Sequence, residues 1–194
     1  MEVTQNISEK EQIKNKVALP LLAIAIGSMV MLFAGLTSAY VVRHGEGNWQ
    51  SLTLPFQFYL STAVILISSL TMNLALAKIK KNDYKASSTF LLYTFGLGLI
   101  FLGLQFSGWS NMIGSGVFFT GKNANASGSF FYMLTALHAA HIIGGFVALA
   151  ITTYNSKKGN YSSERYLGIR LCSIYWHFLD ILWIYLFIFL MNVQ

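Results

Sequence analysis

The stretch GSFFYMLTALHAAHIIGG, from Gly128 to Gly145, opens an apolar run that continues to about Thr153 and carries two histidines near its middle. An ionisable side chain at membrane depth is costly in free energy, so such residues are rare and usually face the interior of a helix bundle. His138 and His141 are three residues apart and would project from the same face of a helix. The central question for this chain is therefore which groups this helix face contacts.

The composition indicates an integral membrane protein. Charged residues make up only 10% of the 194 residues and hydrophobic residues 55%, whereas a soluble domain carries roughly a quarter charged residues. The formal net charge of +6 does not indicate a nucleic-acid partner, because the basic residues lie in short segments between apolar runs. The single cysteine, Cys172, excludes an internal disulfide and a cysteine-based metal cluster.

Five apolar runs predict an all-α bundle of five transmembrane helices, at about residues 17–42, 55–77, 88–110, 129–153 and 171–192. Each run reaches the roughly 20 residues that a helix needs to cross the hydrocarbon core. Residues 1–16 are polar and of mixed charge, and we expect them to form a cytoplasmic tail, either a surface extension or an interfacial helix. Residues 17–194 are expected to form a single membrane domain.

The distribution of basic residues predicts the orientation. Eleven of the 13 lysines and arginines lie in the N-terminal tail, between the second and third spans, or between the fourth and fifth; the other two are Arg43 and Lys122. Because cytoplasmic segments carry the excess of positive charge, we expect the N-terminus in the cytoplasm and the C-terminus outside.

Four ionisable side chains lie inside the predicted spans: His138, His141, His177 and Asp180. At ~1.5 Å per residue, all four fall at ~14 to ~20 Å below the outer surface of a core ~30 Å thick. We therefore expect them to face one another or one shared polar cavity. Three interpretations are open: mutual hydrogen bonding with lipid headgroups as possible partners, metal ligation, and proton relay. A phosphate-binding GxxxxGK[ST] motif and a CxxC pair are absent from the sequence.

Two segments resemble subunit III of the haem–copper oxidases. Phe130–Gly145, FFYMLTALHAAHIIGG, is similar to the family's sixth helix, an aromatic lead-in followed by T-G-x-H-x-x-H-x-x-G. Tyr175–Tyr185, YWHFLDILWIY, is similar to its final helix, Y-W-H-F-x-D-x-x-W. The likeness extends over nearly all five spans and matches the five-helix bacterial form. Helix-packing and motif residues that share it are Gly35, Gln105, Trp109, Thr135, Gly144, Trp176, Phe178 and Trp183.

The resemblance implies an accessory subunit without a catalytic centre, in a terminal cytochrome c or quinol oxidase of aerobic respiration. It implies a bacterial cytoplasmic membrane, direct contact with subunit I, and association with subunit II and other respiratory subunits. Haem and copper would be held by those partners and not by this chain. The family's helix cleft holds structural phospholipid, and the subunit is associated with stability, proton uptake and oxygen access. His138 and His141 match candidate cleft residues, with His177 and Asp180 on the closing helix.

Two positions depart from the family pattern. Met29 and Gly108 stand where the family commonly has glutamates, so a role of those glutamates in proton supply does not carry over. Their loss leaves a second hypothesis open, the related accessory protein of nitric oxide reductases. A hypothesis from another class is an independent membrane metalloprotein or enzyme that uses the His/Asp cluster.

Overall fold

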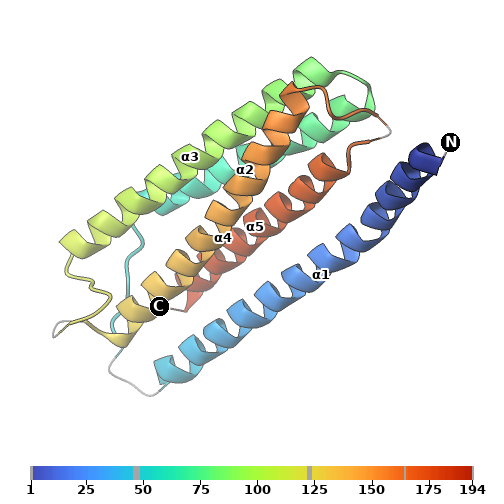
Figure 1. Cartoon of the computed structure of the whole chain (residues 1–194). Coiled ribbons are helices and arrows are strands. Elements are labelled where there is room, and N and C mark those ends of the chain that lie inside the picture. The colour runs from blue at the N-terminus through green and yellow to red at the C-terminus, as the bar shows by residue number, and fades with distance from the viewer. Residues whose placement is uncertain (1, 46–48, 122–123, 164, 194) are drawn as a thin grey trace.

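The computed structural model describes residues 2–45, 49–121, 124–163 and 165–193, with side chains from residue 16 onward. Five long α-helices account for most of this chain (Figure 1). Their bounds are α1 Glu2–Gly45, α2 Phe56–Lys80, α3 Tyr84–Gly114, α4 Ala126–Lys157 and α5 Leu167–Asn192.

The predicted all-α fold with five membrane-crossing helices is confirmed. All five helices found among the described residues are long and apolar enough to cross a membrane. A helix satisfies its own backbone hydrogen bonds, which is why apolar runs of this length adopt it in a medium without water. The two described ends of the chain lie at opposite ends of the bundle, as an odd number of crossings requires (Figure 1).

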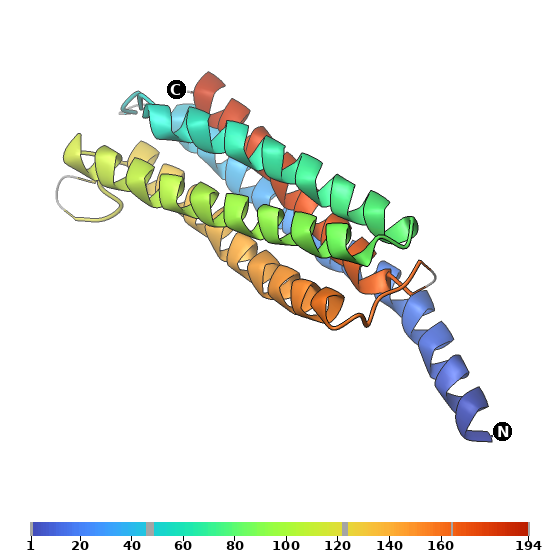
Figure 2. The ribbon, with the colours of Figure 1, turned by 90° about the horizontal axis from the view of Figure 1, so that it is seen from above.

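Helix α1 begins much earlier than the first predicted span. It runs without a break from Glu2, so the polar segment 2–16 is the first part of α1 and Pro20 lies inside the helix. Residues 2–19 contain neither Gly nor Pro to end a helix. This N-terminal part extends beyond the rest of the bundle (Figure 2). Met1, the first residue of the predicted tail, lies outside the described residues.

Helices α2 to α5 form a closed ring. Each packs against its neighbour along the chain, and α2 also packs against α5, which completes the ring. Large aromatic side chains fill its centre, including Phe101 and Trp183, whose rings lie 5.3 Å apart and edge to face. Aromatic pairs in this geometry add to the free energy gained by burial.

Two glycines of α3 allow its neighbours to approach closely. A Cβ atom on Gly98 would lie 2.6 Å from a ring atom of Phe146 on α4 and 2.9 Å from a ring atom of Trp176 on α5. A Cβ atom on Gly108 would lie 2.7 Å from the ring of Phe58 on α2. Small residues at such contacts let membrane helices pack tightly.

Helix α1 lies outside this ring, and among the described helices it packs against α4 and α5. Its contact surface is the row Met29, Phe33, Thr37 and Tyr40, which are its buried residues. Thr37 Oγ1 is 2.9 Å from Tyr185 Oη, and Tyr40 Oη donates to the carbonyl oxygen of Val193 at 3.0 Å. None of residues 16–28 is buried, so α1 is fastened to the bundle through its C-terminal half.

Candidate functional site

The motif of α5 attaches this helix to α2 through its two tryptophans. Trp176 Nε1 donates to Ser68 Oγ at 3.1 Å, and Trp183 Nε1 donates to Thr62 Oγ1 at 3.0 Å. Both indole rings are almost fully buried. A buried indole N–H needs an acceptor, and the hydroxyls of α2 supply one at two successive levels of the bundle. The motif tryptophans therefore fix the position of α5 in the ring.

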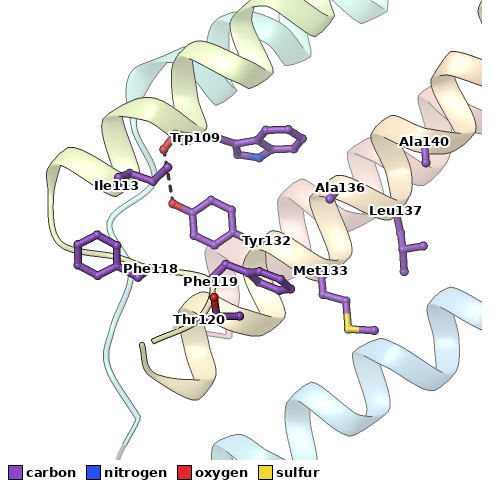
Figure 3. Close-up of a pocket in the computed structure, with 10 residues that line it drawn as sticks. All are labelled: Trp109, Ile113, Phe118, Phe119, Thr120, Tyr132, Met133, Ala136, Leu137 and Ala140. Atoms are coloured by element: carbon purple, nitrogen blue, oxygen red, sulfur yellow. Dashed lines mark hydrogen bonds between the residues drawn. The ribbon is translucent and has the colours of Figure 1, made fainter. Parts of the chain in front are cut away.

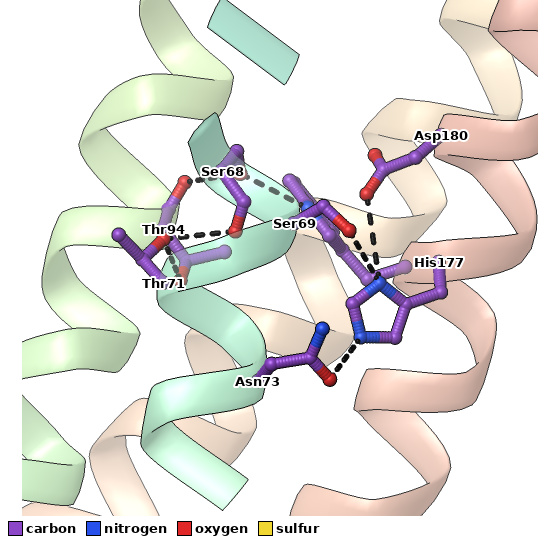
Figure 4. Close-up of polar contacts among 8 residues, drawn as sticks. Ser68, Ser69, Thr71, Asn73, Thr94, His177 and Asp180 are labelled. Carbon is purple, nitrogen blue, oxygen red and sulfur yellow. Dashed lines mark hydrogen bonds and ion pairs between the residues drawn. The ribbon is translucent and has the colours of Figure 1, made fainter. Parts of the chain in front are cut away.

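His177 and Asp180 lie together on the face of α5 that turns toward α2 (Figure 4). His177 Nε2 is 3.0 Å from Asn73 Oδ1, which can only accept, so Nε2 carries the hydrogen and donates it. His177 Nδ1 is 2.7 Å from Ser69 Oγ and 3.8 Å from Asp180 Oδ2. Either it accepts the Ser69 hydroxyl hydrogen as a neutral ring, or it is protonated and pairs with the carboxylate.

The surroundings of Asp180 are apolar. Its side chain is only 4% exposed, and Ile65, Ile142 and Leu179 line the small space beside it. Neither carboxylate oxygen has a hydrogen-bond partner among the described residues. The imidazole of His177, 3.8 Å away, is thus the polar contact that the carboxylate makes. Ionisable groups at membrane depth commonly pair with one another in this way.

This geometry does not form a hydrolase triad. In a Ser–His–Asp triad, serine and aspartate contact opposite nitrogens of the imidazole. Here Ser69 and Asp180 both approach Nδ1 of His177. The arrangement supports hydrogen bonding between α2 and α5 and pairing of His177 with Asp180 within α5.

His138 is buried in the aromatic centre of the ring. Its imidazole stacks on Trp183 with ring centres 5.3 Å apart, and Phe101 contacts it edge to face at 6.3 Å. Neither ring nitrogen has a hydrogen-bond partner within the described part of the chain. His138 therefore packs as a flat aromatic side chain among the rings of α3 and α5.

His141 turns toward α1 instead. Its Nδ1 lies 2.7 Å from the carbonyl oxygen of Leu137, so Nδ1 donates to that carbonyl. Its ring centre is 5.7 Å from the ring of Phe33. The hydroxyl of Tyr175 on α5 donates to the His141 carbonyl oxygen at 3.2 Å. This half-buried residue thus lies where α1, α4 and α5 meet.

The four ionisable residues do not form the single polar cluster that their depths suggested. His177 and Asp180 share a face and contact each other, but their other partners are on α2 and not on α4. His138 packs against rings of α3 and α5, whereas His141 lies against Phe33 of α1. Similar depth does not bring side chains together when the helices present different faces.

Gln105 and Trp109 stabilise the α2–α3–α4 part of the ring. Gln105 Nε2 donates to Ser61 Oγ at 3.0 Å, and Trp109 Nε1 donates to Thr135 Oγ1 at 3.1 Å. Phe178 packs against the core, and a Cβ atom on Gly144 would meet only Tyr175 Oη, at 3.8 Å.

Gly35 was expected to be a helix-packing residue, but nothing lies within 4 Å of where its Cβ would stand. It lies two residues from Phe33 and from Thr37, and therefore on the opposite face of α1 from the row that contacts the bundle. This glycine does not pack against the described residues of its own chain.

An apolar cavity of about 620 Å³ lies between α3, α4 and residues 118–120, which follow α3 (Figure 3). Trp109, Ile113, Phe119, Met133 and Leu137 line much of it. The hydroxyl of Tyr132 also lies here, but it donates to the carbonyl oxygen of Val117 at 3.0 Å. This cavity was not predicted from the sequence; the adjacent Phe118 and Phe119 in a loop rich in Gly, Ser and Asn are the signal that could have indicated it.

Within the described ranges, no three or more His, Cys, Asp or Glu side chains are placed to hold a metal ion. The pair of His177 and Asp180 supplies two such side chains, and its other contacts are a serine hydroxyl and an asparagine amide. A protein-held transition metal normally needs at least three ligands of these types.

Comparison with known proteins gives one consistent family. The family model described as cytochrome c oxidase subunit III matches residues 24–193. A probable cytochrome c oxidase subunit 3 from Nocardia farcinica is 30% identical over 169 residues, covering 84% of this chain and 82% of the relative. Cytochrome c oxidase subunit 3 from Thermostichus vulcanus is 29% identical and covers 86% and 82%. The protein of that name from Corynebacterium diphtheriae is 26% identical and covers 88% of both chains.

Proposed function

The chain belongs to the cytochrome c oxidase subunit III family, and from this premise we propose that it is an accessory, non-catalytic subunit of a terminal oxidase in aerobic respiration. Its five apolar helices and bacterial relatives make it a multi-pass bacterial membrane protein. In this proposal it stabilises the catalytic subunit I, which it contacts directly, and associates with subunit II. Haem and copper are held by those partners.

The observation that carries the proposal is the family match over residues 24–193, which includes the full ring and the row of α1 that packs on it. The polar side chains of the bundle support it. Trp176, Trp183, Gln105 and Trp109 use their hydrogen bonds to join helices. A chain whose buried polar groups serve helix packing is suited to a scaffolding role rather than to a reaction of its own.

We also propose that the chain holds phospholipid. The apolar cavity of about 620 Å³ beside α3 and α4 is large enough for part of an acyl chain. The side chains that line it are mostly apolar, as a lipid tail requires. His141, half-buried where α1 meets α4, is the motif histidine best placed to contact lipid beside α1. Oxygen is small and apolar and would partition into the same cavity, which supports a role in oxygen access.

We propose that the chain supports proton uptake only indirectly, by stabilising the complex. Met29 is buried against the bundle, and Gly108 is covered by the Phe58 ring, whose nearest atom would lie 2.7 Å from an added Cβ. Neither position can supply the carboxyl group that the family commonly has there. A direct proton-carrying role at these two positions is therefore not proposed.

The orientation follows from charge. The α2–α3 turn and the α4–α5 connection, which carry most of the basic residues, lie at the same end of the molecule as the start of α1 (Figure 1). We propose that this end faces the cytoplasm, because the excess of Lys and Arg marks the cytoplasmic side. Lys122, one of the two basic residues assigned to the other side, lies outside the described residues.

Purification of the chain from native membranes in a mild detergent, followed by a reduced-minus-oxidised visible spectrum, tests the proposal. We expect haem absorption together with a large co-purifying catalytic subunit, and the haem type identifies the partner enzyme. A colourless chain of 21.6 kDa on its own would contradict the subunit assignment. Lipid extraction of the same preparation should yield phospholipid that survives extensive detergent washing.

A further inference from the structure

On the basis of the proposed function, we infer that the seam between α2 and α5 around Asn73 and His177 docks a transmembrane helix of another subunit that presents a polar side chain. The seam is polar, lies inside the membrane and is open at the surface of the bundle. His177 is 25% exposed and Asn73 is exposed. Figure 4 shows both side chains meeting from the two helices.

One hydrogen-bonding group of the seam is left without an internal partner. Asn73 uses its Oδ1 to accept from His177 Nε2 at 3.0 Å. Its amide nitrogen carries two further hydrogens, and the described residues provide no acceptor for them. A primary amide that keeps donors unpaired at an open surface is suited to an intermolecular contact.

The depth of Asn73 decides between lipid and protein as the missing partner. Asn73 precedes Lys78 by five residues, which places it about 7.5 Å further into the membrane than the last basic turn of α2. On α5, His177 follows Arg170 by seven residues, or about 10 Å. Phosphate and glycerol groups lie at the level of the basic residues, and the acyl chains that surround Asn73 carry no acceptor.

The neighbouring surface fits a helix. Leu70, three residues before Asn73, is 63% exposed, and Ile181, four residues after His177, is 66% exposed. The seam is thus a polar spot flanked by apolar side chains, which a helix with one hydroxyl, amide or carboxyl group at that level would complement. Interhelical hydrogen bonds of this kind are common between membrane helices. Helix α1 contacts α4 and α5 in the described structure and leaves α2 free.

Site-specific photo-crosslinking in the purified complex tests the inference. A benzoylphenylalanine replaces Leu70 and leaves Asn73 and His177 intact. The matched control replaces Leu92 of α3, which is 42% exposed and lies at a similar distance from the basic end. We expect the probe at position 70 to crosslink to a transmembrane peptide of another subunit, identified by mass spectrometry, with a polar residue within one turn of the crosslink.

Three outcomes would overturn the inference: crosslinking of position 70 to phospholipid alone, to a second copy of this chain, or to no partner. The haem content and subunit composition of the same preparation test the proposed function separately. A complete oxidase without a crosslink from position 70 would therefore refute the docking seam and leave the subunit assignment standing.

A pair of substitutions tests the hydrogen bond itself. Asn73→Leu removes the amide, and Thr89→Leu is the control, because Thr89 is exposed on α3 and its hydroxyl already donates to the Lys85 carbonyl oxygen. In the Asn73→Leu complex we expect about a threefold weaker retention of the chain after detergent washing, the change that one interhelical hydrogen bond gives. Equal retention of both variants and the unaltered chain would overturn the role of Asn73. Thermal unfolding of the isolated variants controls for misfolding.

Discussion

At the scale of single residues, the histidines show how the same side chain takes different roles in one membrane bundle. His177 makes two polar contacts with α2 and one with Asp180 of its own helix, whereas His138 stacks on Trp183 with both nitrogens unpaired in the described structure. His141 donates to the backbone of its own helix. The neighbours, rather than the residue type, decide whether an imidazole serves as a hydrogen-bonding group or as an aromatic ring.

Asp180→Ala is expected to lower the free energy of unfolding by about 1–3 kcal/mol, because His177 loses the carboxylate beside Nδ1 and a small void opens among Ile65, Ile142 and Leu179. Within the oxidase, the expected phenotype is looser association of the chain with unchanged haem spectra. Denaturation in detergent and the subunit ratio after purification measure both effects.

Asp180→Asn is the control, since it keeps the size of the side chain and can donate to His177. We expect it to lose less stability than Asp180→Ala. A complex with Asp180→Ala that purifies intact, with normal lipid content and an unchanged unfolding midpoint, would count against a structural role of the pair.

The sequence predicted part of this site. The spacing of His177 and Asp180 correctly placed both on one face, because helix periodicity is local. Ser69 and Asn73, their partners on α2, were not predicted, since the rotation and axial position of α2 against α5 depend on packing among distant residues. The same limit applies to Trp176 and Trp183, whose hydroxyl partners Ser68 and Thr62 have no motif of their own.

At the scale of elements, α3 shows how glycines set the distance between helices. Gly98 and Gly108 lie under aromatic rings of neighbouring helices, whereas Gly103, between them, has nothing within 4 Å of an added Cβ. Gly108 thus makes room for the Phe58 ring. Tight packing has taken the space that a longer side chain would need.

Gly108→Ala is expected to destabilise the chain by about 1–3 kcal/mol, because the new methyl group overlaps the Phe58 ring. Gly103→Ala is the matched control and is expected to stabilise α3 by about 0.5–1 kcal/mol, since alanine favours the helix. Unfolding monitored by circular dichroism compares the two. Adding Phe58→Leu to Gly108→Ala should restore part of the loss, and failure of this rescue would argue against the overlap.

The start of α3 depends on its N-cap. Asp83 accepts a hydrogen bond from the Ala86 backbone N–H at 3.2 Å, so Asp83→Ala is expected to lower stability by about 0.5–2 kcal/mol. Asp83→Asn keeps a capping oxygen and should lose much less. Asp83 also forms an exposed ion pair with Lys78 at 3.6 Å, and an equal loss in both variants would assign the effect to that pair instead of the cap.

The five helices could be predicted because apolar length is a strong local signal, but their ends were less certain. The first span was placed at residues 17–42, whereas α1 begins at Glu2 and ends at Gly45. Polarity marks where the bilayer ends, and a helix continues past that point when nothing in its sequence stops it. Hydropathy therefore located the membrane segment of α1 and not the helix.

At the scale of the whole molecule, the chain is a ring of four helices with a fifth attached outside it. The ring is closed by α2–α5 packing, and α1 is joined through Phe33, Thr37 and Tyr40 in its C-terminal half. Helix α1 covers the α4–α5 side of the ring and leaves α2 and α3 uncovered, and the basic residues lie mostly at one end of the bundle.

The proposed orientation predicts the accessibility of introduced cysteines. The native cysteine, Cys172, is buried, so we expect the thiol reagent not to label it. A membrane-impermeant thiol reagent added to intact cells should label Ser115→Cys, after α3, and should label Asn160→Cys, after α4, only when the membrane is opened. Both side chains are exposed at their positions. The reverse labelling pattern would invert the assigned topology.

The place of α1 outside the ring also sets an order of events at the ribosome. The chain is made from its N-terminus, so α1 enters the bilayer first, yet in the described structure its packing partners are α4 and α5, which are made last. Between these events α2 and α3 can pair as a local hairpin, while α1 stands alone among lipids. When α5 is inserted, it packs against α2 and so closes the ring, and together with α4 it completes the surface on which α1 packs. A chain that stops before α5 would leave its ring open and its first helix with only α4 to pack against among the described helices, and is expected to be degraded by proteases instead of being assembled.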